Sequence, residues 1–128
     1  AILAGQPIEV FNHGQLRRDF TYIDDIVEGL IRVLDKPATA EAAAPHAAHR
    51  VFNIGNHEPV ALLEFIETLE QALGREAIKE FKPMQPGDVL ATFADTAQLQ
   101  AWVGFSPKTS LKDGIGKFVT WYKGWAGA

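Results

Sequence analysis

The residues best suited to chemistry in this sequence are two adjacent arginines, Arg17 and Arg18. They run into a short aromatic, β-prone segment that ends at Asp24 and Asp25, and an apolar helical pattern follows. This order places a cation at the end of a strand, just before the start of a helix. Because a guanidinium group offers forked donors to phosphate oxygens, the pair predicts a site for an anionic ligand.

The same arginine pair also fits a plain surface role, in which one of them bonds to Asp19. Neighbouring residues on an extended segment point to opposite sides, so we expect one of Arg17 and Arg18 to face inward and the other outward. The residues alone leave the two interpretations open.

Acidic and histidine residues offer a second possible chemistry. The acids Asp19, Asp24 and Asp25 could form a metal site or an acid/base pair, but the positions of Asp24 and Asp25 favour capping of the helix that follows. His46 and His49 have a three-residue spacing that could hold a metal on a helix. Their alanine-rich segment has no nearby acid cluster, so we expect no metal site in this chain.

Several motifs of catalysis and nucleotide binding are missing from the sequence. The turn glycines are isolated, and neither G-x-G-x-x-G, G-x-x-x-x-G-K-[ST] nor G-x-S-x-G occurs. There is no cysteine, which excludes thiol chemistry, disulfides and cysteine-ligated metals. The helical spacing of the C-terminal aromatic residues favours packing over the stacking of bases.

Composition limits the possible partners. The chain has 128 residues and a net charge of -4, and this acidic balance argues against a general nucleic-acid binder. No apolar run approaches the ~18 residues that a membrane-spanning helix needs. We therefore expect no nucleic acid and no membrane partner, and a cytoplasmic setting.

The elements that would position these residues alternate between strand and helix, which predicts an α/β chain. No internal repeat or domain boundary is visible, so residues 1–128 are expected to form a single domain. Residues 1–5 resemble the last turn of a helix, and a chain that opens there is expected to be a piece of a longer protein that exposes apolar surface. Strands are expected at 8–11, 20–22, 50–55 and 78–81, and helices at 23–36, 62–73, 95–103 and 110–125.

One long stretch resembles a known family. Residues 5–29, which contain both arginines, are similar to the C-terminal half of extended short-chain dehydrogenase/reductase enzymes that act on sugar nucleotides. The nearest branch is that of the UDP-glucuronate 4-epimerases. Further segments agree with the family in the same order, at 52–56, 83–89, 94–95, 104–107 and 114–122.

The resemblance implies an α/β fold, the C-terminal substrate-binding half of an extended Rossmann-type enzyme, with short strands and three to four helices. It implies NAD as cofactor, bound mainly by an N-terminal Rossmann half that this chain lacks, and a homodimeric full-length enzyme. The family's catalytic Tyr-x-x-x-Lys is absent, because neither Tyr22 nor Tyr122 has a lysine four residues later. The 128-residue chain alone is expected to be inactive and to carry no cofactor-binding residue.

The resemblance also implies how a UDP-sugar or dTDP-sugar is held. Arg18 matches the arginine that contacts the nucleotide diphosphate, and Val10 and Phe11 match the strand that borders the uracil.

A second set of positions lies in and near the loop that closes over the nucleotide. Gln85 and Asp88 belong to that loop, and Asp88 matches an acid that bonds the ribose. Several relatives carry arginine where this chain has Gln85, so this chain has one phosphate-binding cation fewer. Asn53 matches a position near the substrate in some dehydratases.

The function that the resemblance implies is nucleotide-sugar binding in an NAD-dependent epimerase of the UDP-glucuronate 4-epimerase type, which oxidises C4 to a ketone and reduces it again. One alternative is a dTDP-sugar or UDP-sugar 4,6-dehydratase. Another is a noncatalytic binding module of the same fold.

Overall fold

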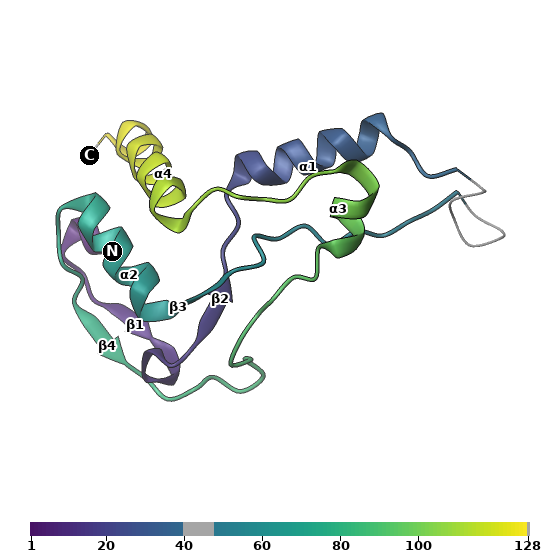
Figure 1. Cartoon of the computed structure of the whole chain (residues 1–128). Coiled ribbons are helices and arrows are strands. Elements are labelled where there is room, and N and C mark those ends of the chain that lie inside the picture. The colour runs from purple at the N-terminus through teal and green to yellow at the C-terminus, as the bar shows by residue number, and fades with distance from the viewer. Residues whose placement is uncertain (40–47, 128) are drawn as a thin grey trace.

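The computed structural model describes residues 1–39 and 48–127. This part of the chain forms short strands joined to α-helices, as the alternating sequence pattern predicts (Figure 1). Two short 3-10 turns, η1 and η2, flank the first strand. The elements in chain order are η1 (Ile2–Ala4), β1 (Ile8–Val10), η2 (Phe11–Gly14), β2 (Arg17–Asp19), α1 (Ile23–Asp35), β3 (Pro59–Ala61), α2 (Leu62–Leu73), β4 (Lys79–Phe81), α3 (Ala97–Val103) and α4 (Leu111–Ala126).

The strands form two separate pairs. β1 runs parallel to β4, with Glu9 opposite Glu80. β2 runs antiparallel to β3, with Arg18 opposite Val60. Both pairs join segments that lie 40 or more residues apart in the sequence, so β2 is positioned by tertiary contacts and not by a local hairpin.

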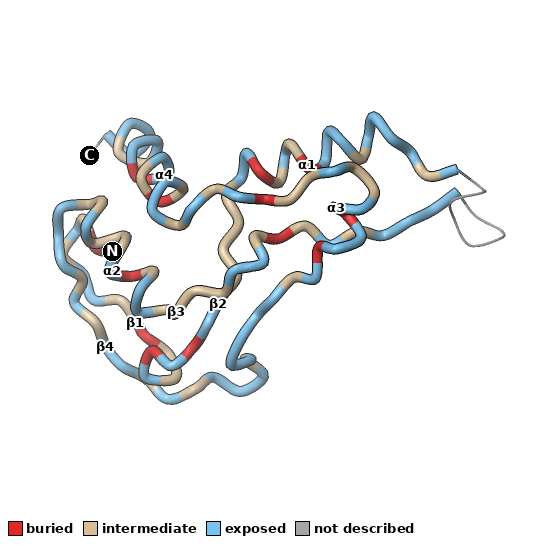
Figure 2. The backbone as a smooth tube through the Cα atoms, viewed as in Figure 1, coloured by how far each residue is buried: buried red, intermediate tan, exposed pale blue. Residues whose placement is uncertain are grey.

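The helices fall into two groups that lie apart from each other (Figure 1). α2 packs against α4 beside the β1–β4 pair, while α1 packs against α3. Buried residues are sparse and scattered over both groups, as Figure 2 shows. The largest fully buried side chains among the described residues are those of Val10 in the first group and Leu99 in the second.

α1 turns its most apolar stripe away from the rest of the chain. Ile23 and Leu30 are each 60% exposed, and Leu34 is 76% exposed. The packed side of the helix carries Asp25 and Gly29 instead, and a Cβ on Gly29 would lie 3.3 Å from the ring of Phe105. The expected exposure of apolar surface is therefore observed along this helix.

The ends of the helices follow local sequence signals. Ser110 caps α4 as expected, because its Oγ accepts a hydrogen bond from the backbone N–H of Asp113 at 3.1 Å. Gly74 ends α2 and Gly104 ends α3, each in the left-handed conformation. At the start of α3, the side chain of Asp95 accepts from the N–H of Ala97 at 3.1 Å.

Two of the expected strands are wrong. Residues 50–55 form no strand, because no neighbouring strand in the described part of the chain pairs with them. Residues 20–22 also form none, and the pairing lies three residues earlier, at β2. In both cases the residues are β-prone, but a strand exists only where a partner backbone lies alongside.

Within residues 1–39 and 48–127, no helix has the length and apolar character needed to cross a membrane. The same residues contain no group of three or more metal-ligating His, Cys, Asp or Glu side chains. His46, one member of the histidine pair considered above, lies outside the described residues.

Candidate anion-binding site

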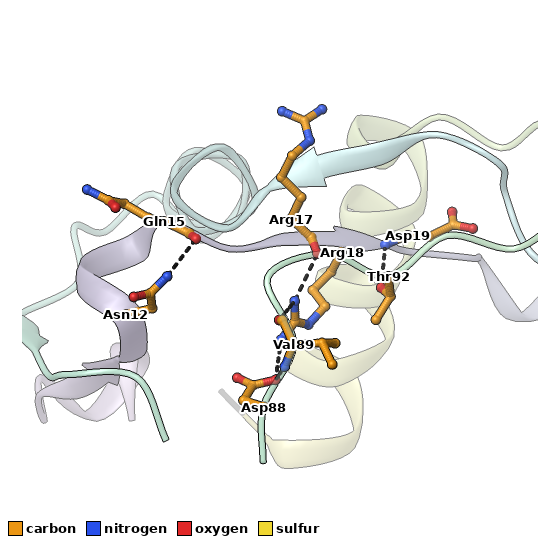
Figure 3. A network of polar contacts seen from close by, with 8 residues as sticks. All are labelled: Asn12, Gln15, Arg17, Arg18, Asp19, Asp88, Val89 and Thr92. Carbon is orange, nitrogen blue, oxygen red and sulfur yellow. Dashed lines mark hydrogen bonds and ion pairs between the residues drawn. The ribbon is translucent and has the colours of Figure 1, made fainter. Parts of the chain in front are cut away.

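β2 is held along both of its edges. β3 occupies one edge, and the segment 90–92 occupies the other. The backbone of Arg17 bonds to this segment twice: its N–H donates to the carbonyl of Leu90 at 2.9 Å, and its carbonyl accepts from the N–H of Thr92 at 3.2 Å. The N–H of Asp19 donates to the Thr92 hydroxyl at 3.2 Å (Figure 3). A segment some 70 residues away in the sequence is thus fixed against the arginine pair.

Arg18 is the centre of this arrangement. Its Nη1 donates to the carbonyls of Arg17 and Val89, each at 2.9 Å, and its Nη2 donates to Oδ1 of Asp88 at 2.6 Å. A guanidinium group has five N–H donors, so two remain beyond these three bonds. The side chain is 22% exposed. An arginine held in this way can take a phosphate oxygen pair with the donors that remain.

Asp88 is fixed from two sides. Its Oδ1 accepts from Arg18 and also from the backbone N–H of Val89, at 2.8 Å. Its Oδ2 has no hydrogen-bond partner within residues 1–39 and 48–127, and the side chain is 27% exposed. One oxygen of this carboxylate is therefore bound within the protein, and the other is open to a ligand.

Arg17 points to the opposite side of β2 (Figure 3). Its Nη2 donates to the carbonyl of Pro59 at 2.5 Å, and the residue is exposed whereas Arg18 is half-buried. The expected alternation of the two arginines is confirmed. The plain surface interpretation required one arginine to bond to Asp19, and the bonds of both arginines go elsewhere.

Asp19 ties three segments together. Its Oδ2 accepts from the N–H of His57 at 3.1 Å and from the N–H of Ala94 at 3.3 Å. Its Oδ1 is buried without a hydrogen-bond partner among the described residues. His57 adopts a positive φ of 61°, a backbone conformation that residues other than glycine rarely adopt. Asp19 thus fixes the end of β2, and among residues 1–39 and 48–127 it belongs to no group of three or more metal-ligating side chains.

The acids at the start of α1 act differently from the caps that the sequence suggests. Tyr22 is the N-cap residue and makes no side-chain capping bond. Asp25 is buried, and its Oδ2 accepts from the backbone N–H groups of Lys108 and Thr109, at 3.2 and 2.8 Å. Both acids do lie in the first turn, where the helix dipole favours negative charge. The capping role is wrong for Asp25, because a distant loop supplies donors that the local sequence does not reveal.

The other sequence-predicted site residues differ in burial and in their hydrogen-bond partners. The side chain of Val10 is fully buried, so only its backbone can border a ligand. Gln85 is exposed and lies in the same loop as Asp88, whose N–H donates to the Gln85 carbonyl at 3.2 Å. Asn53 donates from its side chain to the carbonyl of Asp95 at 3.2 Å. The structure joins Arg18 to Asp88 directly and commits the Asn53 amide to another segment.

One edge of β1 offers backbone hydrogen-bonding groups that the sequence does not reveal. The Val10 carbonyl accepts from the N–H of Lys82 at 2.9 Å, toward β4. Because the C=O and N–H of a trans peptide point in opposite directions, the N–H of Phe11 points away from β4. By the alternation of a strand, the Glu9 carbonyl lies on that same edge. The edge therefore presents an acceptor and a donor side by side, and among the described residues β1 pairs with β4 alone.

An apolar hollow of about 300 Å³ lies between the residues 20–23, Phe65 and the first half of α4. It contains neither Arg18 nor Asp88, so it is separate from the anion-binding site. Two contributors to the site escaped the sequence interpretation: the Val89 carbonyl and the Thr92 hydroxyl. Each depends on backbone pairing between distant segments, for which no sequence signal was present.

Comparison with known proteins supports the predicted resemblance. Residues 1–55 match the NAD dependent epimerase/dehydratase family. The chain is 49% identical over 96% of its length to an uncharacterized 37.6 kDa protein of Escherichia coli O111:H-. It is 45% identical over 95% of its length to a probable UDP-glucuronate 4-epimerase of Rhizobium meliloti. It spans 40% and 39% of the lengths of these two relatives.

The fold has a close counterpart among solved structures. A UDP-glucuronic acid 4-epimerase from Bacillus cereus, in complex with UDP-glucuronic acid and NAD, superposes with a TM-score of 0.80 at 31% sequence identity. The match covers 96% of this chain and 37% of that one. The predicted fold class, an α/β chain with short strands and three to four helices that corresponds to part of a larger enzyme structure, is confirmed.

Proposed function

We propose that this chain is the nucleotide-sugar-binding portion of an NAD-dependent sugar-nucleotide epimerase of the UDP-glucuronate 4-epimerase type. In such an enzyme C4 of the sugar is oxidised to a ketone and then reduced from the other face. The observation that carries the proposal is Arg18, which is held at three points beside Asp88 with two N–H donors left over. The similarity to probable and solved UDP-glucuronate 4-epimerases supports it.

Candidate partners for the diphosphate, the ribose and the base of a UDP-sugar support the proposal. The diphosphate carries two negative charges and takes the two remaining donors of Arg18. The open Oδ2 of Asp88 can accept a bond from a ribose hydroxyl. The β1 edge, with the Glu9 carbonyl and the Phe11 N–H, complements the N–H and carbonyl of a uracil ring. Thymine presents the same two groups, so a dTDP-sugar fits this edge as well.

The hydride chemistry is assigned to residues outside this sequence. NAD, when bound, supplies a reversible hydride acceptor. The chain has no glycine-rich dinucleotide loop and no Tyr-x-x-x-Lys, so its own share is to bind and orient the substrate. The exposed apolar stripe of α1 suits packing against such an additional segment. The proposal includes a homodimeric, cytoplasmic full-length enzyme without nucleic-acid or membrane partners, and an inactive 128-residue chain.

Titration calorimetry with UDP-glucuronate on the natural full-length polypeptide tests the role of Arg18. Loss of a charge-assisted phosphate contact in Arg18→Ala should cost about 1.5–3 kcal/mol, roughly a ten- to hundredfold weaker affinity. Arg17→Ala is the matched control, since it removes an adjacent guanidinium that faces the other side of β2. Equal affinities for wild type and Arg18→Ala would refute the proposed site.

Product analysis separates the epimerase from the alternatives. The matched family includes dehydratases as well as epimerases, so a 4,6-dehydratase is the second candidate. Incubation of the full-length polypeptide with UDP-glucuronate and NAD should yield the C4 epimer. Loss of water from a dTDP-hexose would identify a dehydratase, and tight binding without turnover would identify a noncatalytic module.

A further inference from the structure

The two oxygens of the Asp88 carboxylate have different surroundings. Oδ1 accepts from Nη2 of Arg18 at 2.6 Å and from the N–H of Val89 at 2.8 Å. Oδ2 has no hydrogen-bond partner in the described ranges 1–39 and 48–127. The bond to Val89 fixes the orientation of the carboxylate itself. Asp88 is therefore a rigid acceptor placed directly against the guanidinium of Arg18.

This contact has a consequence for the arginine. A free arginine side chain samples many rotamers, and ordering it during ligand binding lowers the affinity by about tenfold. The guanidinium of Arg18 is already bonded to Asp88 and to the carbonyls of Arg17 and Val89. Of these three acceptors, only the carboxylate of Asp88 can be removed by a side-chain substitution.

We propose that Asp88 is a positioning residue for Arg18, and that its Oδ1 holds the guanidinium so that the two remaining donors face the diphosphate. This inference rests on the proposed function, because it assumes that Arg18 binds a diphosphate. It adds a role that is separate from any bond between Asp88 and the ribose, since the ribose would take Oδ2.

Electrostatics and positioning predict opposite effects of removing the Asp88 carboxylate. A carboxylate beside a diphosphate repels it, so removal of the charge should strengthen diphosphate binding. Positioning predicts that removal of Oδ1 weakens binding in spite of the lost repulsion. The sign of the change in affinity therefore distinguishes the two effects.

Two substitutions separate Oδ1 from the charge. Asp88→Ala removes the charge and the acceptor together. Asp88→Asn removes the charge, but its amide oxygen can still accept from Arg18 and from Val89. The probe is inorganic pyrophosphate, which has no ribose and so is blind to a bond at Oδ2. Its affinity for the natural full-length polypeptide is measured by titration calorimetry, with Arg18→Ala as the reference.

The expected result is roughly three- to tenfold weaker pyrophosphate binding for Asp88→Ala, with affinity restored to the wild-type level or above in Asp88→Asn. Because asparagine restores the acceptor, its rescue would assign the loss in Asp88→Ala to the missing acceptor and not to general damage to the fold. Equal or tighter binding in Asp88→Ala, while Arg18→Ala still weakens binding, would overturn the positioning role and leave the proposed function intact. Failure of Asp88→Asn to restore binding would also overturn it. A wild-type protein that binds neither pyrophosphate nor UDP would overturn both.

Discussion

Substitution of Gly55 by alanine should weaken the hydrogen bonds of Asp19 that hold the end of β2. A Cβ on Gly55 would overlap with the Cβ of Ala94 and would lie 2.9 Å from Oδ2 of Asp19. Both approaches are closer than van der Waals contact, and that same Oδ2 accepts the N–H groups of His57 and Ala94. The added methyl group must therefore push apart segments that are joined by hydrogen bonds.

The expected cost can be estimated from these contacts. Overpacking by one methyl group typically destabilises a protein by about 1–3 kcal/mol. Replacing glycine by alanine stabilises by about 0.4–1 kcal/mol through the unfolded chain, which offsets part of this. We expect Gly55→Ala to lower the free energy of unfolding by about 1–2 kcal/mol. Gly116→Ala is the matched control, because a Cβ on this α4 residue meets nothing within 4 Å, and we expect it to stabilise.

Urea unfolding followed by tryptophan fluorescence measures both variants. The double variant Gly55→Ala/Ala94→Gly removes the closest clash, so it should recover part of the stability lost in Gly55→Ala. The clash with Ala94 is refuted as the cause if Gly55→Ala and Gly116→Ala shift the unfolding midpoint equally. It is also refuted if the double variant is no more stable than Gly55→Ala.

Two further substitutions test polar contacts away from the anion site. The hydrogen bond from Lys79, then that from the N–H of Ala77, lower the pKa of Glu70 below its usual 4.5. Glu70→Gln should therefore lower the free energy of unfolding by about 1 kcal/mol at neutral pH. In urea titrations this difference between wild type and variant should disappear as the pH falls below 4.5, where the wild-type carboxylate protonates. An unchanged difference at about pH 3 would contradict this. Asp25→Ala should cost about 2 kcal/mol and speed hydrogen exchange at the N–H groups of Lys108 and Thr109, which it leaves unpaired. Unaltered exchange would exclude that role.

The sequence predicted the helices well because their signals are local. Apolar periodicity, the Ser110 cap and glycines such as Gly74 lie within or next to the helices that they define. The strands were predicted less well, since pairing decides them. β2 exists where residues 17–19 meet residues 59–61, and the β-prone residues 50–55 have no pairing strand in the described part of the chain.

The candidate site was predicted as a set of residues and not as a geometry. Family resemblance identified both Arg18 and Asp88, which lie 70 positions apart, but assigned them separate ligand contacts. Their ion pair and the parts played by the Val89 carbonyl and the Thr92 hydroxyl follow from the backbone alignment. No pattern in one sequence encodes such an alignment, because each contact depends on which distant segment lies beside β2.

The position of Asp88 against Arg18 is set by the register of segment 88–94 along β2, and not by side-chain contacts alone. Each β2 residue bonds to its own part of that segment: the Arg17 backbone to residues 90 and 92, the Arg18 side chain to residues 88 and 89, and Asp19 to residues 92 and 94. A slip by one residue would break most of these bonds at once and would turn Asp88 away from Arg18. The carboxylate therefore meets the guanidinium because backbone hydrogen bonds on either side fix where it can lie, which allows one arginine to be held ready in a chain with a net charge of -4.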